Sequence, residues 1–203
     1  MNLVPTKTLN YYNQHAQTFS DSTLNVDMSA LYREFLPYVV QNGHVLDAGC
    51  GSARDAAYFK SQGFSVSAFD ASPALAELAS SYLQQPVEVK TFQELECVNK
   101  YDGIWCCASL LHVPKAELPQ VFLNLQNALK PNGVLYVSFK YGTQEREHNG
   151  REFSDLTEQL LSSLLNQHTQ LSIIKHWQSV DQRPGRESEV WLNALITHSK
   201  AKL

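Results

Sequence analysis

A pair of closely spaced glycines, set between an apolar segment and a helix-like one, constrains the fold of this chain more than any other feature. The sequence at residues 45–55 reads Val-Leu-Asp-Ala-Gly-Cys-Gly-Ser-Ala-Arg-Asp. Val45 and Leu46 are predicted to end a buried strand. Gly49 and Gly51 allow the backbone to turn tightly and approach a ligand because neither has a Cβ atom. The strand, turn and helix together predict a cradle for a nucleotide-like ligand.

The residues around this turn indicate which kind of ligand it binds. Dinucleotide-binding turns read G-x-G-x-x-G and place the pyrophosphate at the helix N-terminus, with a third glycine for packing. Arg54 stands where that third glycine would be. Asp47 precedes the first glycine, where a carboxylate would repel a pyrophosphate but would suit a ligand with an ammonium group. The turn therefore favours a nucleoside that carries an amino acid over NAD.

The length and charge of the chain limit its organisation and its partners. Its 203 residues suffice for one domain with a sheet and two helical layers, and 43% of them are hydrophobic, as is typical of globular proteins. The net charge of -4 provides no basic surface for nucleic acid or for an anionic membrane. We therefore expect a small-molecule substrate, no nucleic acid, no membrane, and a monomer or homodimer.

The cysteines and the N-terminus carry neither a metal motif nor an export signal. Cys50, Cys97, Cys106 and Cys107 include no C-x-x-C pair, and no histidine or cysteine pair has zinc-ligand spacing. The first residues lack the basic region and apolar run of a signal peptide, and no stretch approaches the roughly eighteen apolar residues of a membrane span. These observations predict buried thiols, no metal site and a cytoplasmic protein.

Two amphipathic helices are predicted before the glycine turn, at about residues 8–19 and 27–38, the second N-capped by Asp27 or Ser29. Neither helix can form a domain alone, so we expect both to lie across the mouth of the site. The predicted division is a single domain, residues 1–203, with a helical lid at residues 1–40 and an α/β core at residues 41–203.

Beyond the predicted lid, strand-like and helix-like segments alternate, which is the pattern of a parallel sheet covered by helices. The polar segment from Lys140 to Phe153 follows a strand's carboxyl end, where loops face the ligand. It is either a substrate contact or a solvated loop. The predicted strands are 44–46, 65–69, 87–89, one within 101–113 that is followed by a turn, 134–139, 171–180 and 190–198. The predicted helices are 54–62, one that begins at Pro73, 119–130 and 155–167. A turn at residues 130–133 is predicted to follow the third of these helices, and Ser154 is predicted to cap the fourth.

Asp70 ends the second predicted strand, nineteen residues after Gly51. This is close to the spacing of about twenty residues at which a second strand brings a carboxylate to a ribose hydroxyl pair. Ser72 then caps a helix whose first position is Pro73. Asp70 is therefore predicted to bind ribose, with a structural capping role as the alternative.

A second motif lies at residues 101–109, Tyr-Asp-Gly-Ile-Trp-Cys-Cys-Ala-Ser, an apolar strand of the kind that is buried on both faces, ending in small residues. Together with residues 45–53 it resembles the class I S-adenosylmethionine-dependent methyltransferases, and the resemblance covers nearly the whole chain. It implies a three-layer αβα Rossmann-like methyltransferase fold, with a mostly parallel seven-stranded sheet and an antiparallel final hairpin strand. It also implies S-adenosyl-L-methionine as the cofactor, held by Tyr12, Asp47, Ala48, Gly49, Gly51, Ser52, Arg54, Asp70, Ala71, Ser72, Phe92, Cys107 and Ala108.

Finer features bear on the contacts and the acceptor. A packing role is the alternative for Tyr12. In this family the segment at residues 91–95 flanks the adenine, and either Glu94, or Thr91 with the backbone of Phe92 and Gln93, could bind the adenine amine. Methyltransferases that modify base amino groups carry an acid or Asn before Pro-Pro-aromatic at the second motif, which this chain lacks. Gly-Ser-Ala-Arg-Asp, Ser-Leu-Leu-His and Ser-Phe-Lys resemble the small bacterial tellurite-resistance methyltransferases, without establishing a tellurium substrate.

Methyl transfer from a sulfonium needs chiefly in-line placement in a water-poor site, so the absence of a catalytic triad is no objection. Where the nucleophile must lose a proton, His112 is the predicted base, with a packing or capping histidine as the alternative, and His148 a lesser candidate. The resulting prediction is a methyltransferase acting on a small molecule. Its rivals are a cofactor-binding module without catalysis and a nicotinamide-dependent oxidoreductase.

Overall fold

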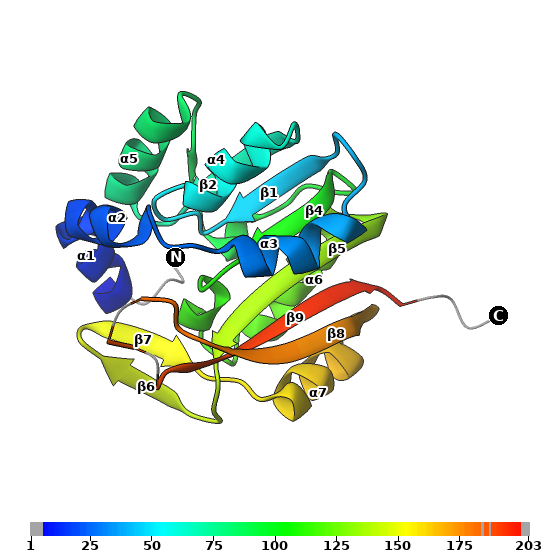
Figure 1. The fold of residues 1–203 in the computed structure, drawn as a ribbon. Coiled ribbons are helices and arrows are strands. Elements are labelled where there is room, and N and C mark those ends of the chain that lie inside the picture. The colour runs from blue at the N-terminus through cyan, green and yellow to red at the C-terminus, as the bar shows by residue number, and fades with distance from the viewer. Residues whose placement is uncertain (1–5, 184, 187, 200–203) are drawn as a thin grey trace.

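The computed structural model describes residues 6–183, 185–186 and 188–199. Within them a seven-stranded sheet has the order β3-β2-β1-β4-β5-β9-β8 (Figure 1). The strands are β1 (His44–Ala48), β2 (Ser65–Asp70), β3 (Glu88–Val89), β4 (Tyr101–Cys106), β5 (Leu129–Lys140), β8 (Leu171–Val180) and β9 (Val190–His198). The helices are α1 (Thr6–Gln14), α2 (Ala16–Thr23), α3 (Ser29–Phe35), α4 (Arg54–Ser61), α5 (Pro73–Leu83), α6 (Leu118–Ala128) and α7 (Glu158–His168).

Strand β9 is antiparallel to both of its neighbours, β5 and β8, whereas β1 to β5 pair in parallel. This arrangement confirms the predicted fold class, including the antiparallel strand in the final hairpin. The parallel strands place their carboxyl ends at one edge of the sheet, so the segments that follow them meet there.

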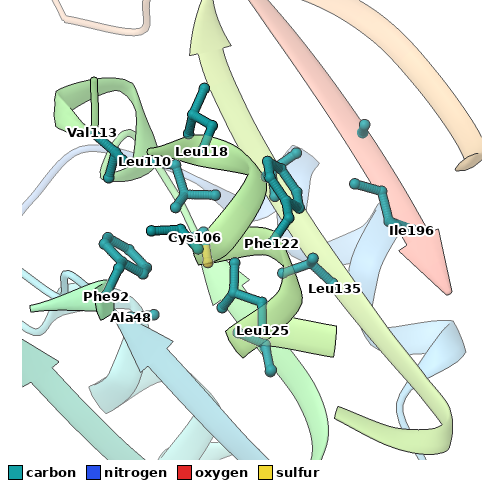
Figure 2. Close-up of a cluster of buried hydrophobic side chains, with 14 of the residues drawn as sticks. Ala48, Phe92, Cys106, Leu110, Val113, Leu118, Phe122, Leu125, Leu135 and Ile196 are labelled. Atoms are coloured by element: carbon teal, nitrogen blue, oxygen red, sulfur yellow. The ribbon is translucent and has the colours of Figure 1, made fainter. Parts of the chain in front are cut away.

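Adjacent residues of the central strands point to opposite faces of the sheet and enter different apolar clusters. Val45 and Trp105 pack with Phe35 of α3 and Phe59 of α4 on one face. On the other face a larger cluster gathers against α6 and α7, and Figure 2 shows its part around Phe122 of α6. Labelled members are Ala48, Phe92, Cys106, Leu110, Val113, Leu118, Leu125, Leu135 and Ile196. Burial on both faces explains why these strands read as continuous apolar runs.

The predicted N-terminal helix at residues 8–19 is wrong in one respect, because it is two helices that break at His15. His15 has a φ of −115° and a ψ of 18°, outside the helical region. The break allows each half to reach a different partner. In α1, the Thr8 hydroxyl accepts a hydrogen bond from the backbone N–H of Glu152 at 2.9 Å. In α2, the Thr23 hydroxyl donates to the Ser52 hydroxyl at 3.2 Å.

The second predicted helix is shorter than residues 27–38. Helix α3 ends at Phe35 and continues as a 3₁₀ turn, Leu36–Tyr38, that contains Pro37. Neither predicted N-cap occupies the cap position, which is Met28, although the Asp27 carboxylate accepts a hydrogen bond from the Ser29 N–H at 2.8 Å.

The segment 140–153 is not a loop, because it contains the antiparallel hairpin β6 (Glu145–His148) and β7 (Arg151–Ser154). Asn149 and Gly150 form its turn with φ values of 51° and 74°. Asn-Gly is a strong signal for such a turn, so the sequence already contained the evidence. Ser154 belongs to β7 and donates to the Val113 carbonyl at 2.7 Å. The next helix, α7, is therefore capped by Thr157 instead of Ser154.

The predicted turn at residues 130–133 also differs, because β5 already begins at Leu129. The pairing of β4 with β5 shifts at this point, because Tyr101 pairs with Leu129 whereas Gly103 pairs with Val134. Residues 130–133 are the extra residues of β5 between these two pairs. Helix α6 accordingly ends at Ala128 instead of Lys130.

Candidate functional site

Two adjacent cavities open where the carboxyl ends of the parallel strands meet, one of about 920 Å³ and one of about 90 Å³. We call them the large cavity and the small cavity. Among the described residues the wall they share consists of Tyr12, Phe19, Gly49, Gly51, Ala108 and His112. The glycine turn therefore lies at the boundary between two binding spaces.

The turn requires its glycines for steric reasons. Gly49 and Gly51 have φ values of 74° and 54°, in the left-handed region. A Cβ atom on Gly49 would lie 2.5 Å from the Ser109 Cβ, and one on Gly51 would lie 3.0 Å from the Phe19 ring. Any other residue would strain the turn and push against the segments that close the shared wall.

Asp47 and Ala48 lie beneath the turn and line neither cavity. The Asp47 carboxylate is buried and accepts a hydrogen bond from the Ala56 N–H at 3.0 Å, which ties β1 to the first turn of α4. Burial and the nearby Asp55 carboxylate raise the pKa of Asp47 well above its ordinary value. Direct contact of either residue with a ligand stays a prediction.

Asp70 joins the glycine turn to the next helix and lines the small cavity together with Ala71 and Ser72. Its carboxylate accepts hydrogen bonds from the Gly51 and Ser72 N–H groups, each at 2.9 Å, one on each oxygen. Burial raises the pKa of Asp70 despite these bonds. Each carboxylate oxygen can accept a further hydrogen bond, so the geometry leaves capacity for two hydroxyl groups.

Two side-chain oxygens without hydrogen-bond partners lie in the walls of the small cavity. They are Gln93 Oε1 and Ser109 Oγ, both buried. Gln93 donates through Nε2 to Glu117 at 2.7 Å, which fixes the amide and leaves Oε1 as an open acceptor. Buried polar atoms without partners are rare, and they indicate a ligand or solvent group that completes them.

The sequence-based alternatives for this wall did not include the Gln93 side chain. Glu94 does not line the small cavity, because its carboxylate accepts from the N–H and the hydroxyl of Thr91, both at 2.8 Å. Phe92 does line it, with its ring 5.3 Å from that of Phe69. The only available sequence signal for Gln93 was its position in the segment after β3.

Tyr12 and His112 form a hydrogen-bonded pair in the shared wall. His112 Nδ1 lies 2.7 Å from the Glu152 carbonyl, which can only accept, so Nδ1 carries the proton. The other nitrogen, Nε2, then accepts from the Tyr12 hydroxyl at 2.8 Å. Burial lowers the pKa of His112 to about 4, so its imidazole is neutral at physiological pH.

Arg54 lines the large cavity but has its guanidinium bound within the protein. It donates to both oxygens of Asp55, at 2.6 and 2.9 Å, and to the Thr23 carbonyl at 3.1 Å. Asp55 also accepts from the Tyr32 hydroxyl and from the Trp105 indole N–H. Arg54 therefore connects the end of α2 to the glycine turn.

The end of β4 lies at the junction of the cavities. Ala108 has a φ of 52°, and its N–H donates to the Ser138 hydroxyl at 2.8 Å. Cys107 lines the large cavity, and burial raises the pKa of its thiol to about 12, which keeps it protonated. A backbone held in this strained region is typical of functional sites.

The large cavity is built from segments that lie far apart in the sequence. They include α2, α3, the glycine turn, the β6–β7 hairpin and the connection between β8 and β9. Of the candidates in the segment 140–153, the cavity is lined by Lys140, Tyr141, Arg146, His148, Arg151 and Phe153. Within the described ranges no cluster of His, Cys, Asp or Glu could hold a metal ion, and no helix is long and apolar enough to cross a membrane.

Comparison with known proteins identifies the family of the chain. A family profile described as a methyltransferase domain matches residues 20–170. Two similar curated proteins are the ubiquinone biosynthesis O-methyltransferases of Rickettsia typhi and Rickettsia prowazekii. Each is 37% identical over 99 residues, covering 46% of this chain and 39% or 38% of the relative. The chain thus spans about two fifths of the length of the curated relatives it matches.

Solved structures with the same fold include two methyltransferases. The 1,6-didemethyltoxoflavin-N1-methyltransferase of Burkholderia thailandensis, bound to its acceptor and S-adenosylhomocysteine, has a TM-score of 0.73 at 24% identity, over 95% of this chain and 85% of that one. A TehB-like methyltransferase from Corynebacterium glutamicum has a TM-score of 0.69 at 18% identity, over 94% of this chain and 98% of that one. These likenesses confirm the fold.

Proposed function

The chain belongs to the methyltransferase-domain family, and we propose that it is an S-adenosyl-L-methionine-dependent enzyme that methylates a small-molecule acceptor by in-line transfer. The observation that carries this proposal is the pair of cavities that meet at the glycine turn. One cavity suits a nucleoside and the other suits an acceptor, and the two share a wall. This family assignment also argues against the nicotinamide alternative.

The small cavity is the proposed site of the adenosine part of the cofactor. Asp70 would receive the ribose hydroxyls, and Phe92 would pack against the base. Gln93 Oε1, fixed by Glu117 and without a partner, would accept a hydrogen bond from the adenine amine. Gly49 and Gly51 line both cavities, and a Cβ atom on either would press against Ser109 or Phe19 and disturb the wall along which the cofactor would pass. The residues present thus fit this cofactor.

When bound, the cofactor supplies an activated methyl group on a sulfonium, and the remaining work of the protein is placement. Ala108 and Cys107 would hold the cofactor's methionine side where the two cavities join. Ser52 and Arg54 line the same region. Tyr12 and Phe19, whose rings lie 5.1 Å apart, cover the wall and reduce access of water. In-line transfer then requires only that the acceptor enter from the large cavity.

His112 is the proposed base, acting through Tyr12. The Tyr12 hydroxyl donates to His112 Nε2, and its oxygen, which also accepts from the Arg151 side chain, keeps a lone pair for an O–H or N–H group of the acceptor. The acceptor would give its proton to the Tyr12 oxygen as the Tyr12 proton moves to Nε2. A pKa of about 4 makes His112 a weak base. It suffices for an oxygen nucleophile, because a methylated hydroxyl that still carries its proton is an oxonium, a strong acid.

Residues 1–40 are the proposed lid of a single domain, although residues 1–5 lie outside the described part. Leu9, Tyr12 and Phe19 of the two N-terminal helices line the small cavity. Polar contacts hold α1 and α2 to the core, among them a Lys7–Glu147 ion pair at 2.7 Å and the hydrogen bond from Arg54 to the Thr23 carbonyl. We infer that these contacts open when the cofactor exchanges.

Two measurements test the proposed function. Thermal shift with S-adenosylmethionine, S-adenosylhomocysteine and NADH should show stabilisation by the first two alone, since a ligand that binds the folded state stabilises it. Transfer of a labelled methyl group should then be measured on small acceptors and on fractions of a cell extract. Binding of the cofactor without transfer to any fraction would favour a module that has lost catalysis.

A further inference from the structure

Arg151, the first residue of β7, is a buried cation without a carboxylate partner in the described part of the chain. Its side chain lines the large cavity, and only 8% of the residue is exposed. Its Nε is buried and has no hydrogen-bond partner. The guanidinium carbon lies 4.5 Å from the centre of the Tyr11 ring, 5.4 Å from Phe153 and 6.0 Å from Tyr12.

The other partly buried cations that line the large cavity are all paired within the described ranges. Arg54 pairs with Asp55, Lys140 with Asp181 and Glu189, Arg146 with Asp155, and Arg183 with Asp181. Arg33 also lines the cavity without an ion pair, but it is exposed to solvent. Among the described residues Arg151 is therefore the buried cation of this cavity whose charge remains available to a ligand.

An arginine in this position favours a specific ligand chemistry. Its guanidinium stays protonated, and burying such a charge is costly unless an anion or hydrogen-bond acceptors compensate it. The aromatic faces compensate part of the cost through cation–π contact. They cannot replace a hydrogen-bond acceptor for Nε, whereas a carboxylate can bind the planar guanidinium through two parallel hydrogen bonds.

We propose that Arg151 binds a carboxylate of the methyl acceptor, an inference that rests on the proposed function. Arg151 lines the large cavity and not the small one, which places it on the acceptor side of the shared wall. Arg151 contacts Tyr12, which is hydrogen-bonded to His112. A carboxylate on Arg151 would therefore lie beside the Tyr12–His112 pair that is proposed to receive the acceptor's proton. The substrate class is therefore a small organic acid that carries a nucleophilic oxygen or nitrogen.

The test compares carboxylates with their neutral amides on the full chain. Benzoate, phenylacetate and butyrate, each beside its amide, are titrated by NMR into the protein with and without S-adenosylhomocysteine. We expect at least one carboxylate to bind about 10-fold or more tightly than its amide, as a charge-assisted hydrogen bond permits. Arg151→Met, which keeps the stem packing, should abolish the preference, and Arg151→Lys should restore part of it.

Lys7→Met is the matched control, because Lys7 is a cation at the same contact of α1 with the hairpin but lines neither cavity. It should keep the carboxylate preference. The proposal is overturned if the native chain shows no preference, or if Arg151→Met keeps it while remaining folded by circular dichroism. A cation that only stacks on aromatic rings predicts the first of these results.

A second arm separates the acceptor from the cofactor, whose methionine part also carries a carboxylate. Arg151→Met should bind S-adenosylhomocysteine as the native chain does. If it binds S-adenosylhomocysteine more weakly but 5′-methylthioadenosine equally well, Arg151 holds the cofactor's carboxylate and the proposal fails. If the native chain binds neither nucleoside, the proposed function fails, while the carboxylate comparison without cofactor still judges Arg151.

Discussion

The two cavities are built in different ways. The walls of the small cavity come largely from residues at or just after the carboxyl ends of β1, β2, β3 and β4, where a parallel fold always gathers segments. The walls of the large cavity combine α2, α3, the β6–β7 hairpin and the β8–β9 connection, which are distant in sequence. Local motifs therefore specify the small cavity, whereas the large cavity depends on how remote segments pack.

A change in the wall that the two cavities share should have the largest effect on cofactor binding. Gly49→Ala should weaken binding of S-adenosylhomocysteine by about 100-fold or more. The alanine would be strained at this backbone conformation and would collide with a neighbour, together costing about 3 kcal/mol, and the turn would have to move out of its binding position to relieve them. The added Cβ would lie 2.5 Å from the Ser109 Cβ. Isothermal titration calorimetry measures the affinity.

Gly63→Ala serves as its control. Gly63 also has a positive φ, 88°, but it lines neither cavity, and its nearest neighbour would be the Asn42 side chain at 3.4 Å. This variant should lose about 1 kcal/mol of unfolding free energy and keep its affinity. Equal losses of affinity in both variants would show that the turn acts only through stability.

The pH dependence of stability tests His112 in the shared wall. Its folded pKa of about 4 lies below the ordinary 6.5, so the unfolded chain binds the proton more readily. The His112 contribution is therefore constant above pH 6.5 and is lost as the pH falls from 6.5 towards 4, by up to about 3 kcal/mol. Urea unfolding gives the unfolding free energy of the native chain and of His112→Gln at each pH. Plotted against pH, the two free energies should differ in slope only in this window.

That comparison uses the difference between two chains because buried Asp47 and Asp70 titrate with the opposite sign. Their raised pKa values add stability as the pH falls. They do so equally in both chains. Parallel pH profiles would mean that His112 is not a buried neutral histidine.

Asp70→Asn tests the ribose contact that is proposed for the small cavity. The amide cannot accept from the Gly51 N–H, the Ser72 N–H and a ribose hydroxyl as the carboxylate can, so affinity for S-adenosylhomocysteine should fall about 30-fold, or about 2 kcal/mol. Affinity for 5′-methylthioadenosine, which keeps the ribose, should fall equally.

Asp102→Asn is the matched control, because Asp102 lies at the other end of β4 and pairs with Lys130 at 2.8 Å, away from both cavities. It should bind both nucleosides normally. An undiminished affinity in Asp70→Asn would refute the ribose assignment.

The smallest expected effect concerns the base. Gln93→Leu should lose about 5-fold in affinity for S-adenosylhomocysteine, the value of one neutral hydrogen bond of about 1 kcal/mol. S-inosylhomocysteine, which lacks the amine, should bind the native chain and the variant alike. Calorimetry with both ligands isolates the contact. If the native chain does not distinguish the two ligands, Gln93 Oε1 does not face the amine.

Local sequence signals were enough to predict the fold class and several of the residues that line the small cavity. Alternating segments, the glycine turn, and Asp70 at a strand end are local signals, because residues a few positions apart in a strand–turn–helix unit have fixed geometry. The burial of successive strand residues in opposite clusters follows from the same local periodicity.

The large cavity could be described only from the tertiary structure. The sequence indicated neither the break at His15 nor the isolation of Arg151 from carboxylates. It could not show that Glu152 of the hairpin would fix the His112 proton on Nδ1 and leave Nε2 to Tyr12. Such contacts join residues up to 100 positions apart. Their charge states and orientations depend on burial and on partners that no local pattern specifies.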